Sequence, residues 1–205
     1  MVNVKLPSHI VITGVLLTFL SCRHSPQVIL PPDVELKPGD LVFRLGAGLT
    51  SKAITTYDCN GHYSHVGMVV DSAGYPMIIH AVPDEHDSPS DFDRVRMDAP
   101  DVFFDSFRAL CGAVCRPINQ DVVHQVTSYA WQAYHRQAAF DHAYDMSDTT
   151  NLYCCELVIR AFIHAGASLT LPPQHHVNAH WFNIDSCYFP SDIYMAPELK
   201  PLYIF

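Results

Sequence analysis

The chain has 205 residues, of which 49% are hydrophobic and 16% charged, so most of it is expected to fold around a core rather than stay disordered. Its formal net charge is −9 with histidine neutral, and it contains no cluster of Lys and Arg. These values argue against nucleic acid, and against an anionic membrane surface, as the main partner.

The N-terminus has the composition of an export signal. An apolar run from Ile10 to Leu20 is shorter than the roughly 20 residues that a membrane-spanning helix needs. The run ends in the sequence FLSC, which resembles a bacterial lipobox. We expect residues 1–22 to be a signal peptide and Cys22 to be the lipidation site of an exported, membrane-anchored lipoprotein. A plain signal peptide, which would give a secreted or periplasmic protein, is the alternative.

A Pro-rich segment, residues 23–35, is predicted to tether a single folded domain that covers residues 36–205. This domain begins with a Pro-Gly turn and a short apolar strand over residues 41–43. The sequence GLTSKAITTYD, which comes next, favours a short helix.

The clearest β-hairpin covers residues 62–82. Two runs rich in Val, Ile and Met flank a predicted turn at residues 71–74. An acidic, turn-rich loop follows at residues 83–93, and the sequences DRVRMDAPDVFFDSF and CGAVCRP suggest further strands.

Two helices are predicted after these strands, at residues 119–139 and 153–165. Thr150 or Asn151 can cap the second helix, and Gly166 can end it. The tail beyond it is rich in Pro, His and aromatic residues and is expected to wrap the domain surface. In the first helix a stripe of 3.6-residue period predicts the buried face: Val122, Val123, Val126, Tyr129, Ala130, Ala133 and Tyr134.

Strands followed by helices predict an α+β fold, in which one small antiparallel sheet packs against helices. Within the second helix, the apolar stripe that faces the sheet begins with a cysteine, and Cys155 points about 100° away from it. The stripe consists of Cys154, Leu157, Val158, Ala161, Phe162 and Ala165.

Cys154 is therefore the candidate nucleophile. Backbone N–H groups at the start of a helix lower the pKa of a thiol and can bind an oxyanion. The alternative is that Cys154 is a small core residue, since free cysteines are often buried.

A thiolate nucleophile needs a base, and the base needs an orienting partner. If residues 71–74 form a four-residue turn, His65 directly faces His80 on the same side of the sheet. His176 and His180 have a helix-type zinc spacing but lack the Glu of an HExxH motif. We therefore expect no metal site and no cofactor.

Six cysteines remain after Cys22, and in an exported chain they could form up to three disulfides. A bridge from Cys154 to Cys155 or to Cys187 would bury the candidate nucleophile. The first of these is strained, because the two Cα atoms would be closer than disulfide geometry prefers.

Four motifs, LKPGDLVF, SHVGMVV, MIIHAV and YCCELV, occur in an order that resembles the circularly permuted NlpC/P60 papain-like superfamily, and within it the YiiX/YebB-like group. The resemblance implies a papain-like fold with Cys154 as nucleophile at a helix N-terminus, His65 as general base and His80 as the orienting third member. The sequence departs from the group at His80, where Glu is usual, and at Phe140, where Tyr is usual.

Together with the predicted export signal, the resemblance implies an exported Cys-His hydrolase that cleaves an amide through a thioester. The expected substrates are cell-wall stem peptides, or a related γ-glutamyl or peptide bond, so the expected partners are peptidoglycan fragments and, through the lipid anchor, a membrane. Two alternatives remain: a lipid or ester acyl hydrolase or acyltransferase on the same fold, and a non-catalytic peptide-binding lipoprotein.

Overall fold

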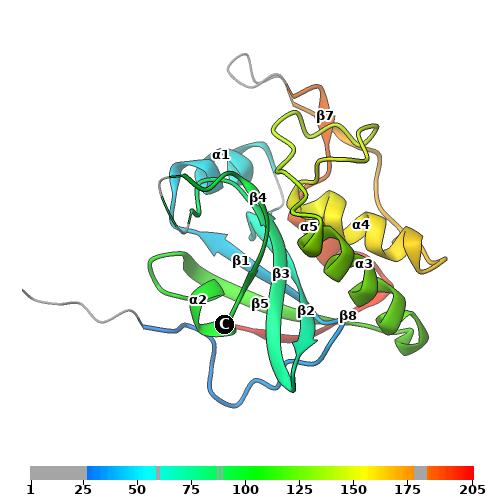
Figure 1. Cartoon of the computed structure of the whole chain (residues 1–205). Helices are drawn as coiled ribbons and strands as arrows, with labels where there is room; N and C mark the ends of the chain where they lie inside the picture. The colour runs from blue at the N-terminus through cyan, green and yellow to red at the C-terminus, as the bar shows by residue number, and fades with distance from the viewer. Residues whose placement is uncertain (1–26, 59–60, 87, 89, 178–183) are drawn as a thin grey trace, which may run out of the picture.

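A curved antiparallel sheet forms the centre of the computed structural model, which describes residues 27–58, 61–86, 88, 90–177 and 184–205 (Figure 1). The signal peptide with Cys22, Cys59 and His180 lie outside these residues. The sheet has six strands in the order β4-β3-β2-β1-β5-β8. They are β1 Leu41–Gly46, β2 His65–Ser72, β3 Tyr75–Val82, β4 Arg94–Asp98, β5 Ala109–Pro117 and β8 Leu199–Ile204.

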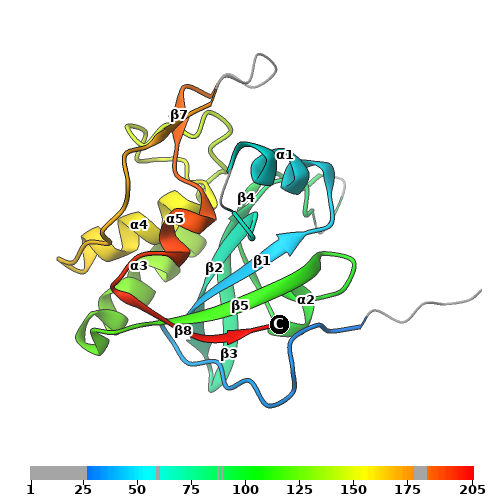
Figure 2. The ribbon, with the colours of Figure 1, turned by 180° about the vertical axis from the view of Figure 1, so that it is seen from behind.

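Helices α3 and α4 pack against each other and cover one face of the sheet (Figure 2). This arrangement confirms the predicted α+β fold class. No helix among the described residues is long and apolar enough to cross a membrane. The remaining elements are α1 Leu49–Tyr57, α2 Pro100–Phe103, the 3₁₀ helix η1 Gln120–Val122, α3 Val123–His135, α4 Cys154–His164, α5 Pro190–Tyr194 and the short strand pair β6 His175–His176 and β7 Ser186–Cys187.

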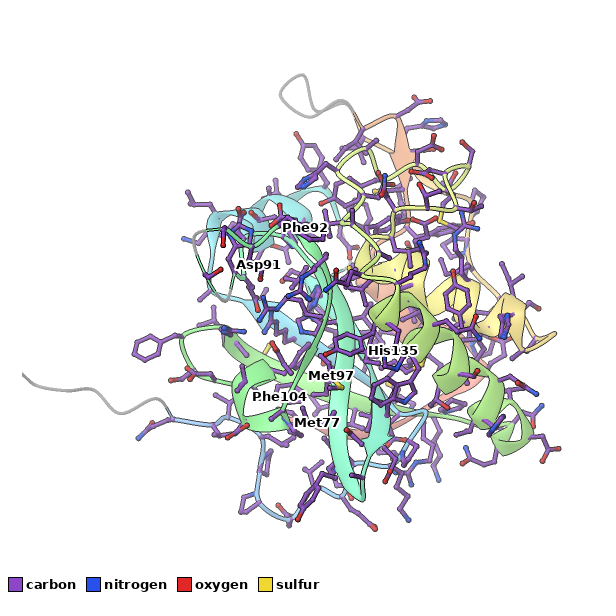
Figure 3. The ribbon with its side chains drawn as sticks, viewed as in Figure 1. Met77, Asp91, Phe92, Met97, Phe104 and His135 are labelled. Atoms are coloured by element: carbon purple, nitrogen blue, oxygen red, sulfur yellow. The ribbon has the colours of Figure 1, made fainter. Side chains whose placement is uncertain are left out.

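The two faces of the sheet bury two separate apolar clusters. The larger one lies between the sheet and α3 and α4, and it includes Val126, Ala130 and Ala133 of the predicted stripe. The smaller one contains Phe104, which lies near α2 (Figure 3). Four apolar residues that precede β1 pack on this smaller cluster, namely Ile29, Leu30, Val34 and Leu36. The described part of the expected tether therefore covers a face of the sheet.

The hairpin of β2 and β3 is confirmed, but its predicted register is wrong by two residues. Ser72 pairs with Tyr75, so the turn has only two residues, Ala73 and Gly74, with φ values of 55° and 88°. Both left-handed conformations suit a two-residue hairpin turn. Because a shift of two residues keeps every side chain on its own face, His65 and His80 still share a face.

Helix α4 begins without the predicted side-chain cap. Its N-cap residue is Tyr153, which has an extended backbone and makes no capping hydrogen bond through its side chain. The predicted cap from Thr150 or Asn151 is wrong, because both residues lie in a bend that ends before the helix begins at Cys154. The predicted stop is confirmed: Ala165 is the C-cap, and Gly166 follows with a φ of 68°.

The C-terminal tail does more than wrap the surface. Strand β8 pairs antiparallel with β5 and forms an edge of the main sheet. Helix α5, just before it, packs against α4 and buries Ile193 in the larger cluster. The sequence did not predict this strand, because Pro201 interrupts it; proline is tolerated there because β8 is an edge strand.

Candidate active site

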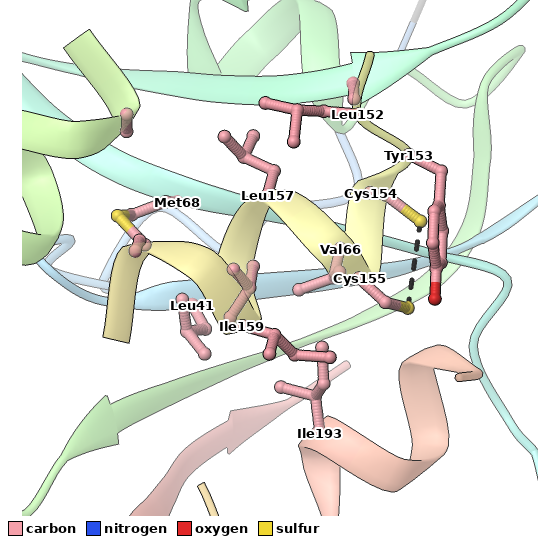
Figure 4. Packing of buried hydrophobic residues seen from close by; sticks show 14 of the residues in the cluster. Leu41, Val66, Met68, Leu152, Tyr153, Cys154, Cys155, Leu157, Ile159 and Ile193 are labelled. Atoms are coloured by element: carbon pink, nitrogen blue, oxygen red, sulfur yellow. Dashed lines mark hydrogen bonds between the residues drawn. The ribbon is translucent and has the colours of Figure 1, made fainter. Parts of the chain in front are cut away.

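Cys154 is the first residue of α4 and lies where that helix begins beside β2 (Figure 4). Its side chain is 7% exposed. His65, the first residue of β2, and the backbone N–H of Val66 lie close enough to the Cys154 sulfur to lower the pKa of this thiol. The start of one strand and the start of one helix thus bring the predicted nucleophile and the predicted base together.

His80 joins this pair from the neighbouring strand β3. Its Nδ1 lies 2.9 Å from His65 Nε2, and its Nε2 lies 3.2 Å from a carboxylate oxygen of Asp98 at the end of β4. His80 is fully buried and Asp98 nearly so. Hydrogen bonds therefore run from His65 through His80 to Asp98, and Cys154 lies at the His65 end of this line.

This line fixes the tautomer of both imidazoles. A carboxylate only accepts hydrogen bonds, so His80 donates its Nε2–H to Asp98 and its Nδ1 must be an acceptor. His65 then donates its Nε2–H to His80, which leaves Nδ1 of His65 unprotonated. That free nitrogen is the one available to take a proton from Cys154.

Asp98 is the member of this line that the sequence analysis missed. Burial alone would raise the pKa of Asp98, but the hydrogen bond from His80 and the charges of Arg96 and Arg108 outweigh it and lower the pKa to about 2. Arg108 lies 3.1 Å and Arg96 3.8 Å from its carboxylate oxygens. The sequence RVRMD alternates polar and apolar residues. This pattern could have predicted that Asp98 lies on the opposite face of the strand from the apolar Val95 and Met97.

Cys155 lies closer to the nucleophile than the helical-wheel argument predicts. It is fully buried, and its Sγ lies 3.9 Å from Sγ of Cys154 (Figure 4). Cys155 points to a different side of α4 from Cys154, as predicted, but this side is also buried, because α5 covers it through Ile193. Both cysteines of the pair therefore belong to the buried surroundings of the site.

The pKa of Cys154 is held well below that of a free thiol. The hydrogen bond from Cys155 is the largest cause, burial opposes it, and the hydrogen bond to His65 adds to it. Burial and the neighbouring Cys154 raise the pKa of Cys155 in turn. Of the two adjacent thiols, only Cys154 is thus prepared to become a thiolate.

Burial lowers the pKa of His65 to about 4, while its hydrogen bond with Cys154 opposes that shift. Near neutral pH the imidazole is therefore uncharged and ready to accept a proton. Cys154 and His65 share one proton between them, which is the arrangement that a thiol nucleophile and a general base require.

Two cavities meet at this pair. The apolar pocket, of about 60 Å³, has Cys154 in its wall, together with Ala53, Tyr144 and Phe189. The polar pocket, of about 400 Å³, has His65 in its wall, together with Arg44, Glu85 and Arg108. Three residues line both cavities: Thr50, Ile54 and Ser64.

The described cysteines are free thiols, namely Cys111, Cys115, Cys154, Cys155 and Cys187. Neither of the bridges considered for Cys154 is formed among them. His176 lies in β6, and the described residues contain no group of three or more His, Cys, Asp or Glu placed to hold a metal ion.

Comparison with known proteins supports the fold alone. No family model matches the sequence, and no curated protein matches it. A solved structure, described as the metalloprotein YiiX (DUF1105) from Escherichia coli O157:H7, superimposes with a TM-score of 0.64 at 17% sequence identity. The match covers 82% of this chain and 96% of that chain. The protein therefore has a YiiX-like α+β fold.

Proposed function

We propose that the protein is a Cys-His hydrolase that cleaves an amide through a thioester intermediate, on a papain-like fold of the circularly permuted NlpC/P60 type. The observation that carries the proposal is the position of Cys154 beside His65, at the end of the line of hydrogen bonds that runs from His65 through His80 to Asp98. A purely structural cysteine needs no buried histidine beside its sulfur.

In the proposed reaction, Cys154 passes its proton to Nδ1 of His65 and its sulfur attacks the carbonyl carbon of the substrate. The free N–H groups of the first turn of α4 hold the oxyanion. His65 then returns the proton to the leaving amine as the C–N bond breaks, which leaves a thioester on Cys154. Water, deprotonated by His65, attacks the thioester and releases the acid and the free thiol.

His80 takes the third position of the proposed triad, where related proteins usually carry Glu. A neutral imidazole stabilises a protonated His65 less than a carboxylate does. Here Asp98 supplies the negative charge one residue further away, because it accepts the second N–H of His80. The pair of His80 and Asp98 would thus replace a single carboxylate as the orienting group.

The proposed substrate is a cell-wall stem peptide, or a related γ-glutamyl or peptide bond, because the N-terminal sequence predicts export and lipidation at Cys22. A lipid or ester acyl hydrolase, or an acyltransferase, would use the same thioester and differ only in the leaving group and the acceptor. A non-catalytic peptide-binding lipoprotein is the second alternative, and it needs no reactive thiol.

Alkylation of the purified protein by iodoacetamide, measured against pH and assigned to each cysteine by mass spectrometry, tests the proposal. We expect Cys154 to react with a midpoint well below the roughly 8.5 of a free thiol. Cys187 is a control within the same protein, because burial raises its pKa to about 12. If Cys154 reacts no faster than Cys187, the enzyme proposal is wrong and the peptide-binding alternative takes its place.

A further inference from the structure

The two pockets lie on different sides of the reacting pair. Cys154 is in the wall of the apolar pocket but not of the polar one, whereas His65 is in the wall of the polar pocket but not of the apolar one. Because Thr50, Ile54 and Ser64 line both, the two cavities adjoin each other. A substrate with its carbonyl carbon at the Cys154 sulfur would reach into both.

The proposed chemistry decides which half of the substrate enters which pocket. The group that protonates the leaving atom must lie within hydrogen-bond reach of it, and this group is His65. The leaving half of the substrate therefore lies on the His65 side, in the polar pocket. The acyl half, which stays bonded to the sulfur, lies on the other side of Cys154, in the apolar pocket.

The polar pocket suits a hydrophilic leaving group. Glu85 forms ion pairs with both Arg44 and Arg108, so the wall next to His65 carries charges of both signs. His86 also lines this pocket. An amine or an amino-acid leaving group would find both donors and acceptors there.

The apolar pocket suits a different kind of group. Its wall is almost entirely carbon and sulfur, and it is built from aromatic and aliphatic side chains such as Ile54, Tyr144 and Phe189. The hydroxyl of Tyr153, another wall residue, already accepts a hydrogen bond from the backbone N–H of Tyr188. A charged acyl group would lose most of its hydration here and would gain few polar partners.

The size of the apolar pocket sets the size of the acyl group. A cavity of about 60 Å³ provides room for about four to six atoms of the size of a water molecule, at roughly 10–15 Å³ for each. This is enough for a branched or short straight aliphatic chain. A long fatty acyl chain would extend beyond the pocket.

We propose that the acyl half of the substrate is a short, uncharged, apolar group of about four to six non-hydrogen atoms beyond the carbonyl carbon, held in the apolar pocket beside Cys154. This inference rests on the proposed Cys-His hydrolase. It selects a peptide or amide whose acyl side is small and aliphatic over a γ-glutamyl donor, which carries a carboxylate and an amine.

The test compares the acylation of Cys154 by 4-nitrophenyl esters of acetic, 3-methylbutyric, hexanoic, dodecanoic and glutaric acids. Nitrophenolate release gives the rate, and mass spectrometry locates the adduct. We expect the 3-methylbutyryl and hexanoyl esters to react at least about 10-fold faster than the acetyl and dodecanoyl esters. Glutarate, matched to hexanoate in length but charged, is expected to react at least about 10-fold more slowly than hexanoate.

A variant that narrows the apolar pocket tests whether the acyl half of the substrate binds in that pocket. Ala53→Leu adds three carbons inside the apolar pocket on a helix that favours Leu, so the preferred ester is expected to become acetate. Thr56→Leu is the matched control, because Thr56 is exposed on the same helix and lines neither pocket. This control is expected to keep the chain-length profile of the wild type.

The outcomes separate this inference from the proposed function. A flat chain-length profile, or glutarate as fast as hexanoate, overturns the apolar acyl group but leaves the hydrolase standing if Cys154 still alkylates with a low midpoint. An unchanged preference in Ala53→Leu also overturns it. Absence of any acyl adduct on Cys154, together with slow alkylation, overturns both proposals.

Discussion

Three neighbours lower the pKa of Cys154, and Cys155, whose Sγ lies 3.9 Å away, has the largest effect. The other two are His65 and the backbone N–H of Val66. A buried thiolate without such partners would be too costly to form, because burial disfavours the charged form. The vicinal cysteine therefore has a role in the site even though it is not the nucleophile.

Two substitutions at Cys155 separate its hydrogen bond from its volume. A serine can still donate a hydrogen bond, so Cys155→Ser is expected to move the alkylation midpoint of Cys154 by less than about half a pH unit. Cys155→Ala removes the donor and is expected to raise the midpoint by about one unit. Iodoacetamide kinetics against pH measure both shifts. Equal shifts in the two variants would assign the effect to packing.

Asp98 is predicted to act as a positioning residue for the two histidines. In Asp98→Asn the side-chain amide can donate to His80, which allows His80 to adopt the other tautomer and His65 to carry its proton on Nδ1. Acyl transfer is then expected to fall about 100-fold, and the alkylation midpoint of Cys154 is expected to rise.

The matched control for this substitution is Asp101→Asn, which changes an exposed aspartate at the start of α2. It is expected to leave both readouts unchanged. If Asp98→Asn only lowers the melting temperature and leaves the midpoint of Cys154 where it was, Asp98 has a structural role and does not position the histidines.

At the scale of elements, the hairpin shows why the sequence HVG has a glycine, Gly67, two residues after His65. A Cβ atom on Gly67 would lie 2.6 Å from a methyl carbon of Ile78 and 3.2 Å from Cβ of His80. Any larger residue would push His80 away from its hydrogen bonds with His65 and Asp98. The absence of a side chain at Gly67 thus lets β2 and β3 hold the two imidazoles side by side.

Helix α4 carries a buried acid directly behind the nucleophile. Glu156 is fully buried and pairs with Arg160, which also donates to the backbone carbonyls of Met146 and Asp148. These contacts hold the loop that carries Tyr144 into the wall of the apolar pocket. One carboxylate oxygen of Glu156 has no hydrogen-bond partner within the described part of the chain.

Burial raises the pKa of Glu156 to about 7, although Arg160 opposes the shift. Since this folded-state pKa lies above the ordinary value of 4.5, Glu156 contributes stability at low pH that is lost as the pH rises from about 4.5 to about 7. Glu156→Gln cannot titrate. The free energy of unfolding of the variant, relative to the wild type, is therefore expected to rise by on the order of 2 kcal/mol between pH 4.5 and pH 8.

Urea denaturation at several pH values measures this difference. The wild-type curve alone is not sufficient, because His65, whose pKa is lowered to about 4, changes stability in the opposite direction over part of the same range. A difference between variant and wild type that stays constant from pH 4.5 to pH 8 would contradict the assignment to Glu156.

The elements that the sequence predicted well are those with a strong local pattern. The 3.6-residue period located α3 and α4, and alternating apolar runs located the hairpin. The hairpin register was wrong because Asp71 and Ser72, which resemble turn residues, extend the ladder to a tighter turn. Asp98 was missed because only the pairing of β4 with β3 brings it near His80.

At the scale of the whole molecule, both faces of the sheet are covered, and each by a different kind of structure. Helices α3 and α4 cover one face, and α2 with residues 29–36 covers the other. The composition of residues 23–35 predicted a tether, because the prolines in this segment disfavour both helix and strand. Its apolar residues nevertheless find a partner in the sheet, and no local pattern reveals that partner.

The second face also supports the site. Phe103 of α2 contacts the rings of both His65 and His80, with centroid distances of 5.8 Å and 5.1 Å. Phe104, the next residue, packs edge-on against Phe103 at 4.9 Å and against Phe205 at 5.2 Å. Phe104 has no contact of this kind with either histidine and belongs to the apolar cluster alone.

Phe104→Ala therefore tests whether the second face contributes stability without setting the chemistry. Removing this buried ring is expected to lower the free energy of unfolding by about 3–5 kcal/mol, measured by urea denaturation. Phe107→Ala is the matched control, because Phe107 is 62% exposed, and its loss is expected to change stability by less than about 0.5 kcal/mol.

In the folded Phe104→Ala protein, the alkylation midpoint of Cys154 is expected to match that of the wild type. The pKa of Cys154 depends on its contacts with Cys155, His65 and Val66, and none of these contacts involves Phe104. A large shift of that midpoint at a pH where the variant remains folded would mean that the second face acts on the site through Phe103. In that case the covering of the sheet by α2 and residues 29–36 is part of what holds the two histidines in line.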